Sequence, residues 1–141
     1  MTKNDEECAA RLIAQKTGLQ FSRGHFTLDG WGKVDAFVLL KSNRYLFLEV
    51  EKGQHHSCTN VLKIWPYLER NPQVAVVLAQ AFFHGSRGCD SSRAKLGCWI
   101  GQRIEMTLRG RFSYRRLVIA SDSSRILEGL EELLQSLKDF V

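Results

Sequence analysis

The strongest constraint on this chain is a pair of apolar runs within Trp31–Gln54 that carry acids where a strand pattern predicts hydrophobic residues. The polar segment Lys41–Arg44 separates the runs and is typical of a hairpin turn. Strand alternation places Glu49 and Glu51 on one face of the second run, and Asp35 lies in the first. Buried carboxylates are costly unless they bind a positive group. A hairpin therefore predicts three converging carboxylates, which suit Mg²⁺ because this hard cation prefers oxygen ligands.

A plainer structural explanation of these acids stays open. The carboxylates can lie at strand ends, where they face solvent or pair with Lys33 and Lys52. Glu6 and Glu7 near the N-terminus pose a similar choice. They can add metal ligands, but as first-turn acids they already complement the dipole of a predicted helix. We favour the helix-dipole interpretation for these two residues.

The length of 141 residues suits a single domain, 1–141, that can bury about two-thirds of its unfolded surface. No apolar run approaches the roughly 20 residues needed to span a bilayer. The first residues, MTKNDEECAARL, lack the apolar core of a signal peptide. The four cysteines form no CxxC pair, which is typical of reduced thiols. We therefore expect a cytoplasmic protein that makes no contact with a membrane.

The net charge of +5 is distributed unevenly. Five arginines crowd into one short segment near the C-terminal third of the chain: Arg103, Arg109, Arg111, Arg115 and Arg116. A guanidinium offers a planar fork of donors and stays charged, so such clustering suits a phosphate backbone. A solvated basic face is the open alternative. With the acidic hairpin, the cluster predicts a nucleic-acid surface.

Hydrophobic periodicity predicts an α/β fold. The expected elements are a helix over 4–16, a strand within 19–28, strands over 33–40 and 45–51, a helix after 57 interrupted near Pro66, a strand over 74–79, a helix over 91–106, a strand over 112–120 and a helix over 122–140. The run at 74–79 is continuously apolar, as expected of a strand buried on both faces. The order strand, helix, strand implies a right-handed parallel crossover. The chain thus predicts an αβββαβ core, with a central mixed sheet flanked by helices, and a C-terminal helix-strand-helix extension.

The acidic pattern, Asp35 followed after thirteen residues by Glu49-Val50-Glu51, resembles the active-site motif of the PD-(D/E)XK nuclease superfamily. That family places an acid on its second core strand and an acid-x-lysine triplet on its third, and then runs through a helix to a buried strand. The order of elements is similar over Asn4–Gln80. The resemblance implies a restriction-endonuclease-like fold and a divalent ion, Mg²⁺ or Mn²⁺, bound by Asp35, Glu49, Glu51 and the carbonyl of Val50.

The chain departs from the family motif at two positions. Val34 stands where proline is common, and Glu51 stands where lysine is usual, although Glu-x-Glu occurs in some restriction enzymes of the superfamily. Lys52 is adjacent, but strand alternation turns it to the opposite face unless a β-bulge intervenes. Gln54 can orient water or a phosphate, or can be a simple loop residue. The candidate catalytic residues are Asp35, Glu49, Glu51, Lys52 and Gln54.

Two main functions follow from these expectations. The first is a Mg²⁺-dependent or Mn²⁺-dependent nuclease that hydrolyses phosphodiester bonds, with DNA as the expected substrate, by metal-activated water. The second is a catalytically degenerate nuclease-fold protein that binds nucleic acid or a protein partner without cleavage. An unrelated metal-binding α/β domain is a weaker third option. Because the chain is too short for a separate recognition domain, we expect a homodimer or a partner subunit.

Overall fold

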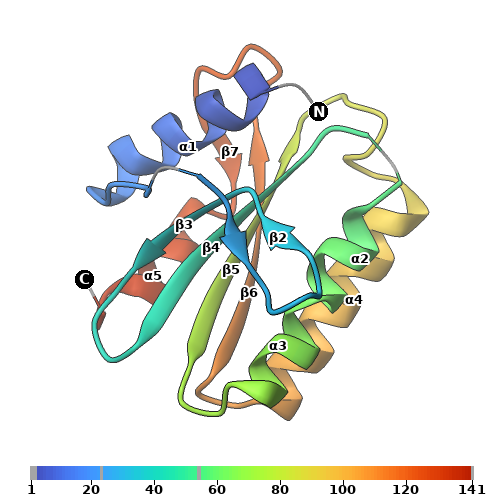
Figure 1. The fold of residues 1–141 in the computed structure, drawn as a ribbon. Coiled ribbons are helices and arrows are strands. Elements are labelled where there is room, and N and C mark those ends of the chain that lie inside the picture. The colour runs from blue at the N-terminus through green and yellow to red at the C-terminus, as the bar shows by residue number, and fades with distance from the viewer. Residues whose placement is uncertain (1–2, 23, 54, 141) are drawn as a thin grey trace.

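A five-stranded mixed sheet forms the centre of the protein (Figure 1). The computed structural model describes residues 3–22, 24–53 and 55–140. The strands lie in the order β3-β4-β5-β6-β7, with bounds β3 (Ala36–Leu39), β4 (Arg44–Glu51), β5 (Ala75–Phe83), β6 (Phe112–Ile119) and β7 (Ile126–Glu128). Strands β4, β5 and β6 are parallel, whereas β3 and β7 pair antiparallel at the two edges. A separate two-stranded antiparallel sheet joins β1 (Phe26–Thr27) and β2 (Lys33–Val34).

Helices cover both faces of the sheet (Figure 1). On one face lie α1 (Lys3–Thr17) and α5 (Leu130–Leu137). On the other lie α2 (Ser57–Leu62), α3 (Ile64–Arg70) and α4 (Ser92–Thr107). Of the helices in the described residues, none has the length and apolar character needed to cross a bilayer. The predicted α/β class with helices around a mixed sheet is confirmed.

The two faces of β4 have different contents because successive side chains alternate. Leu46, Leu48 and Val50 are buried in the core under α1 and α5. Phe47 is buried in the core under α2, α3 and α4. By the same alternation Glu49 shares the face of Phe47. The acids of β4 therefore point beneath the helices that follow them in the chain. All nine residues of β5 are buried, as its continuous apolar run predicted.

The predicted helix with a proline interruption is observed as α2 and α3, which meet at Lys63. Pro66 lacks the N–H that would donate to the carbonyl of Leu62, so regular α-helical bonding cannot continue through this point. Lys63 still has helical backbone angles, with φ of −60° and ψ of −21°. From this junction the Lys63 side chain reaches Glu49 near the end of β4.

The predicted C-terminal extension is wrong in one element. We expected a helix from Asp122 or Ser123, but residues Ile126–Glu128 form strand β7, which pairs with the end of β6. The Asp122 carboxylate accepts the N–H of Ser124 (3.0 Å), and Ser123 has a φ of 63°, so this segment forms a tight turn. The helix begins only after Gly129, whose φ is 91°. The extension is therefore helix-strand-strand-helix.

The contact between α4 and β6 depends on Gly101, and its replacement tests this packing. A Cβ at Gly101 would overlap the ring of Tyr114, which is itself buried. We expect Gly101→Ala to lower the free energy of unfolding by about 1–3 kcal/mol, since overpacking outweighs the higher helix propensity of alanine. Urea denaturation measures this change. Gly53→Ala is the matched control, because nothing lies within 4 Å of a Cβ there. Equal stability of Gly101→Ala and wild type would contradict the described packing.

Candidate active site

The predicted carboxylates line a single cavity at the end of β4. The cavity has a volume of about 430 Å³, and Asp35, Glu49 and Glu51 all contribute to its wall. Glu6 reaches it from α1, and Lys63 from the junction of α2 and α3. Residues from the sheet, the first helix and the later helices thus meet at one edge of the central sheet, the edge at which the sequence predicted the site.

Asp35 breaks the first acidic run into two strands. The main-chain ladder between β3 and β4 ends at the pair Ala36 and Leu48. Beyond it, Oδ2 of Asp35 accepts the N–H of Val50 at 2.8 Å, so a carboxylate takes the place of a main-chain acceptor. The N–H and C=O of one strand residue point to the same neighbour. The carbonyl of Val50 therefore faces the side of Asp35, where the metal-binding hypothesis requires it.

Glu49 is an almost completely buried acid paired with a lysine. Its side chain is 3% exposed, and Oε1 lies 2.8 Å from Nζ of Lys63. Burial raises the pKa of Glu49 well above its usual range, and the nearby charge of Asp35 raises it further, while Lys63 lowers it. Lys63 Nζ also donates to the carbonyl of Lys33 (2.6 Å) and to Oδ1 of Asn60 (3.1 Å). Two hydrogen bonds and one ion pair therefore fix the position of the ammonium group.

Glu51 is held by side-chain amides. Its Oε1 and Oε2 accept Nδ2 of Asn60 at 2.8 and 3.1 Å, and Oε2 also accepts Nε2 of Gln80 at 3.0 Å. Burial raises the pKa of Glu51, and the hydrogen bonds from Asn60 and Gln80 oppose this shift. Gln80 also donates to the carbonyl of Ser57 (2.9 Å) and accepts the hydroxyl of Tyr114 (2.5 Å). The network thus runs from β4 across β5 to β6.

The two remaining candidate catalytic residues have different outcomes. Lys52 lies at the rim of the cavity, but its side chain is 53% exposed and its Nζ is 3.4 Å from Oδ2 of Asp5 on α1. Strand alternation has turned it away from the partners of Glu49. Gln54 lies outside the described residues, so its predicted role stays a prediction.

Sequence reasoning missed Lys63, which is the only lysine of the described residues within 4.0 Å of Glu49. A signal was present in the sequence. Asn60 and Lys63 are polar residues three positions apart on a helix whose other inward positions, Val61 and Ile64, are apolar and fully buried. Residues at this spacing share a helix face. A polar pair on the apolar face of a helix that follows an acidic strand predicts partners for the buried acids.

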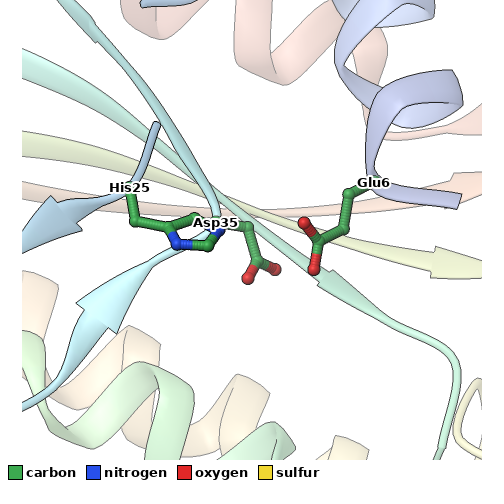
Figure 2. A group of neighbouring side chains, drawn as sticks. All are labelled: Glu6, His25 and Asp35. Atoms are coloured by element: carbon green, nitrogen blue, oxygen red, sulfur yellow. The ribbon is translucent and has the colours of Figure 1, made fainter. Parts of the chain in front are cut away.

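A second unforeseen group combines Glu6, His25 and Asp35. Each residue offers one potential ligand atom, and these atoms all lie within 4.8 Å of one another. Figure 2 shows the Asp35 carboxylate between the His25 ring and the Glu6 carboxylate. Burial raises the pKa of Glu6, and the charge of Asp35 adds to the shift. The sequence analysis interpreted Glu6 as a residue that complements the helix dipole and did not predict that it lies beside Asp35 and His25.

The donor set fits a divalent cation. Asp35, Glu49, Glu51 and the Val50 carbonyl are oxygen donors, which suit Mg²⁺ and Mn²⁺. Lys63 already neutralises one oxygen of Glu49, and amide donors occupy both oxygens of Glu51. Asp35 accepts one main-chain N–H through Oδ2 and, among the described residues, is not paired with a cation, so it keeps its negative charge available for an ion.

Three of the five predicted nucleic-acid-binding arginines make contacts within the protein. Arg111 donates to the carbonyl of Leu68 at 2.6 Å. Arg115 donates to Oε1 of Glu105 at 2.8 Å, and Arg116 donates to the carbonyl of Cys89 at 2.7 Å. These bonds tie loops and helices to β6. These hydrogen bonds are structural, and a phosphate that bound the same guanidinium groups would have to replace them.

The other two arginines, Arg103 and Arg109, are exposed. Arg103 lies on α4 with its guanidinium 5.2 Å from the ring centre of Trp99, which is also exposed. An arginine beside an exposed aromatic ring is a combination that can bind a phosphate and stack on a base. The predicted basic cluster is thus divided between a structural part and an accessible part.

No protein-family model, curated protein or solved structure matches this chain. The resemblance to the PD-(D/E)XK superfamily therefore stays a prediction from the sequence, based on the Asp35 and Glu49-Val50-Glu51 pattern and the expected order of elements.

The raised pKa of Glu49 predicts a specific dependence of stability on pH. A folded-state pKa above the usual value of about 4.5 means that folding favours the protonated acid, so its contribution to stability falls as pH rises from that value through the folded-state pKa. Glu49→Gln cannot ionise. We expect the free energy of unfolding of this variant to rise relative to wild type as the pH increases above about 4.5.

The measurement is urea denaturation at several pH values in the presence of EDTA. Glu7→Gln, at an exposed position on α1, is the matched control. Parallel stability curves for Glu49→Gln and wild type would show that Glu49 titrates alike in the folded and unfolded states.

Proposed function

We propose that this protein is a metal-dependent nuclease that hydrolyses phosphodiester bonds, with DNA as the expected substrate. The observation that carries the proposal is the convergence of Asp35, Glu49, Glu51 and Lys63 on one cavity. Glu51 occupies the motif position where the family has lysine. Lys63, 2.8 Å from Glu49, brings an ammonium group into the same cavity from the junction of α2 and α3.

The arrangement of α1, β1 to β4, the α2–α3 pair and β5 supports the restriction-endonuclease-like core as part of this proposal. Asp35 directly precedes β3, Glu49 and Glu51 lie on the antiparallel neighbour β4, and a helical crossover leads to the buried parallel strand β5. The predicted αβββαβ order matches this half of the chain only if β2 and β3 count as one strand interrupted at Asp35 and α2 and α3 as one helix. The first predicted strand is the short β1, which pairs with β2 outside the five-stranded sheet.

The chain's own residues divide the chemical work. Asp35, Glu49 and the Val50 carbonyl would hold Mg²⁺ or Mn²⁺, which when bound neutralises the scissile phosphate and lowers the pKa of a bound water. Glu51 is the candidate general base, since burial raises its pKa and so makes it a stronger proton acceptor.

Lys63 is the candidate electrophilic residue. Negative charge develops on the phosphate oxygens in the transition state, and a fixed ammonium group stabilises it without reorganisation. Lys63 is suited to this role because Glu49, Asn60 and the Lys33 carbonyl hold its Nζ in place and its side chain is only 15% exposed.

One alternative has its own support. A nuclease-fold protein that binds nucleic acid or a protein partner without cleavage would retain the acids as structural groups. The pairing of Glu49 with Lys63 and the occupation of both Glu51 oxygens by Asn60 are consistent with that role. Cleavage measurements on defined variants separate the two proposals.

We expect Asp35→Ala and Glu49→Ala to abolish cleavage of a labelled DNA duplex with Mg²⁺ or Mn²⁺, while binding of the duplex is retained or tightens because a negative charge is lost. Lys63→Met should lower the rate constant about 10²–10³-fold, as expected for loss of one fixed transition-state donor. Lys41→Met, at an exposed position, is the matched control for the lysine.

Lys52→Met identifies the working lysine. If Lys52 supplies the ammonium group, its variant loses activity and Lys63→Met keeps it, which would contradict our assignment. Glu51→Lys distinguishes a nuclease from a protein that only binds nucleic acid. If Glu51 is the general base, the substitution reduces a cleavage activity that the wild type already has. If Glu51 replaced a lost catalytic lysine, the substitution creates weak cleavage in a protein that otherwise does not cleave.

Nucleic-acid affinity should depend on the exposed arginines. Each phosphate contact adds about 0.9 to the slope of log affinity against log salt on duplex DNA, so Arg103→Ala with Arg109→Ala should lower the slope by about one to two units. Arg11→Ala, at an exposed position of α1 on the other face of the sheet, is the control. An unchanged slope in the double variant would assign the binding surface elsewhere.

A further inference from the structure

We infer that Glu6, His25 and Asp35 form a cation position of their own, which prefers a divalent first-row transition ion to Mg²⁺. The inference rests on the proposed function only in its use of Asp35. It deepens that function, because it names the class of metal held beside the proposed nuclease centre and adds two residues that the nuclease motif does not contain.

The first observation is geometric. Glu6 lies in the first turn of α1, His25 just before β1, and Asp35 between β2 and β3, so three separate segments bring these residues to one point. Their potential ligand atoms lie within 4.8 Å of one another (Figure 2). An ion about 2 Å from each ligand sets the ligand atoms about 3–4 Å apart. Small side-chain rotations are enough to reach that spacing.

The second observation is the chemistry of the donors. Two carboxylates and an imidazole are a mixed oxygen and nitrogen set. Mg²⁺ selects oxygen donors, whereas imidazole is a ligand of transition ions. The all-oxygen set of Asp35, Glu49 and the Val50 carbonyl does not make this distinction. The presence of His25 therefore predicts a preference that the nuclease motif alone does not.

The third observation concerns where negative charge is available. Lys63 pairs with Glu49, and amides hold Glu51. Asp35 and Glu6 instead repel each other, and a cation between them would relieve that repulsion. The Val50 N–H fixes the orientation of Asp35 in advance.

The dipole of α1 explains an acid at Glu6 by itself. It does not explain why an imidazole from a different segment lies beside the same carboxylate. A ligand position accounts for Glu6 and His25 together.

The test measures metal binding and does not require cleavage. Mn²⁺ is the probe, because it accepts an imidazole nitrogen together with carboxylate oxygens and binds cysteine thiols less readily than softer transition ions do. Titration followed by the electron paramagnetic resonance of free Mn²⁺ gives affinity and stoichiometry. Electron-spin-echo modulation from a directly bound nitrogen identifies the imidazole.

We expect wild type to bind Mn²⁺ with a nitrogen coupling and to release it only to a large excess of Mg²⁺. His25→Ala should lose the coupling, bind Mn²⁺ at least about tenfold more weakly and lose most of the preference over Mg²⁺, because even second-shell changes cost about 10–100-fold. Glu6→Gln should weaken binding and keep the coupling. Glu7→Gln and His56→Ala should match wild type. His25 and Glu7 are exposed, so their variants are expected to fold.

Three results would overturn the inference: no Mn²⁺ binding, a nitrogen coupling that survives in His25→Ala, or displacement of Mn²⁺ by an equal concentration of Mg²⁺. A coupling lost in His56→Ala would assign the nitrogen to the loop after β4 instead. Mn²⁺ binding with the expected coupling but without DNA cleavage would contradict the proposed nuclease and leave this inference standing.

Discussion

The burial of two carboxylates at the end of β4 is the constraint on which this structure depends. Glu49 and Glu51 lie in the interior, where an unpaired charge would be strongly destabilising. Lys63 from the α2–α3 junction meets the first acid, and Gln80 of β5 meets the second. Gln80 then bonds Tyr114 of β6, whose ring packs against α4. Satisfying the acids thus fixes how the helices on this face lie on the sheet.

Such a network is weak support for stability, because the cost of removing the charges from water offsets much of their mutual attraction. Hydrophobic residues of similar size would fill the same space. The network is therefore consistent with our proposal that the acids serve chemistry at the cavity, with Asp35 as the link between its parts. Asp35 ends the β3–β4 ladder, accepts Val50, and lies beside Glu6 and His25 at the rim. Its position connects the proposed nuclease centre to the inferred transition-ion position.

The sequence predicts those features that depend on local periodicity. Alternation in β4 correctly placed both glutamates on one face, and helical spacing found α1 and α4. Lys63 and His25 could not be placed, since their roles arise from segments that meet only in the folded chain. The arginine cluster could not be resolved into its parts for a related reason, and its role in binding nucleic acid stays a prediction. Adjacent residues on β6 point to opposite faces, so Arg115 and Arg116 cannot share a patch. Near the C-terminus, apolar residues with helical spacing led us to predict a helix where β7 is observed. Asp122 and Gly129, which lie in the turns on either side of β7, were the signals of this strand.

The most direct test of the account is the action of the wild-type protein on supercoiled plasmid DNA with Mg²⁺ or Mn²⁺, beside the same reaction with EDTA. The account predicts nicked or linear product that requires the divalent ion and disappears with the chelator. Intact plasmid under every metal condition, together with intact single-stranded DNA and RNA and a normally folded protein, would contradict the proposal of a nuclease.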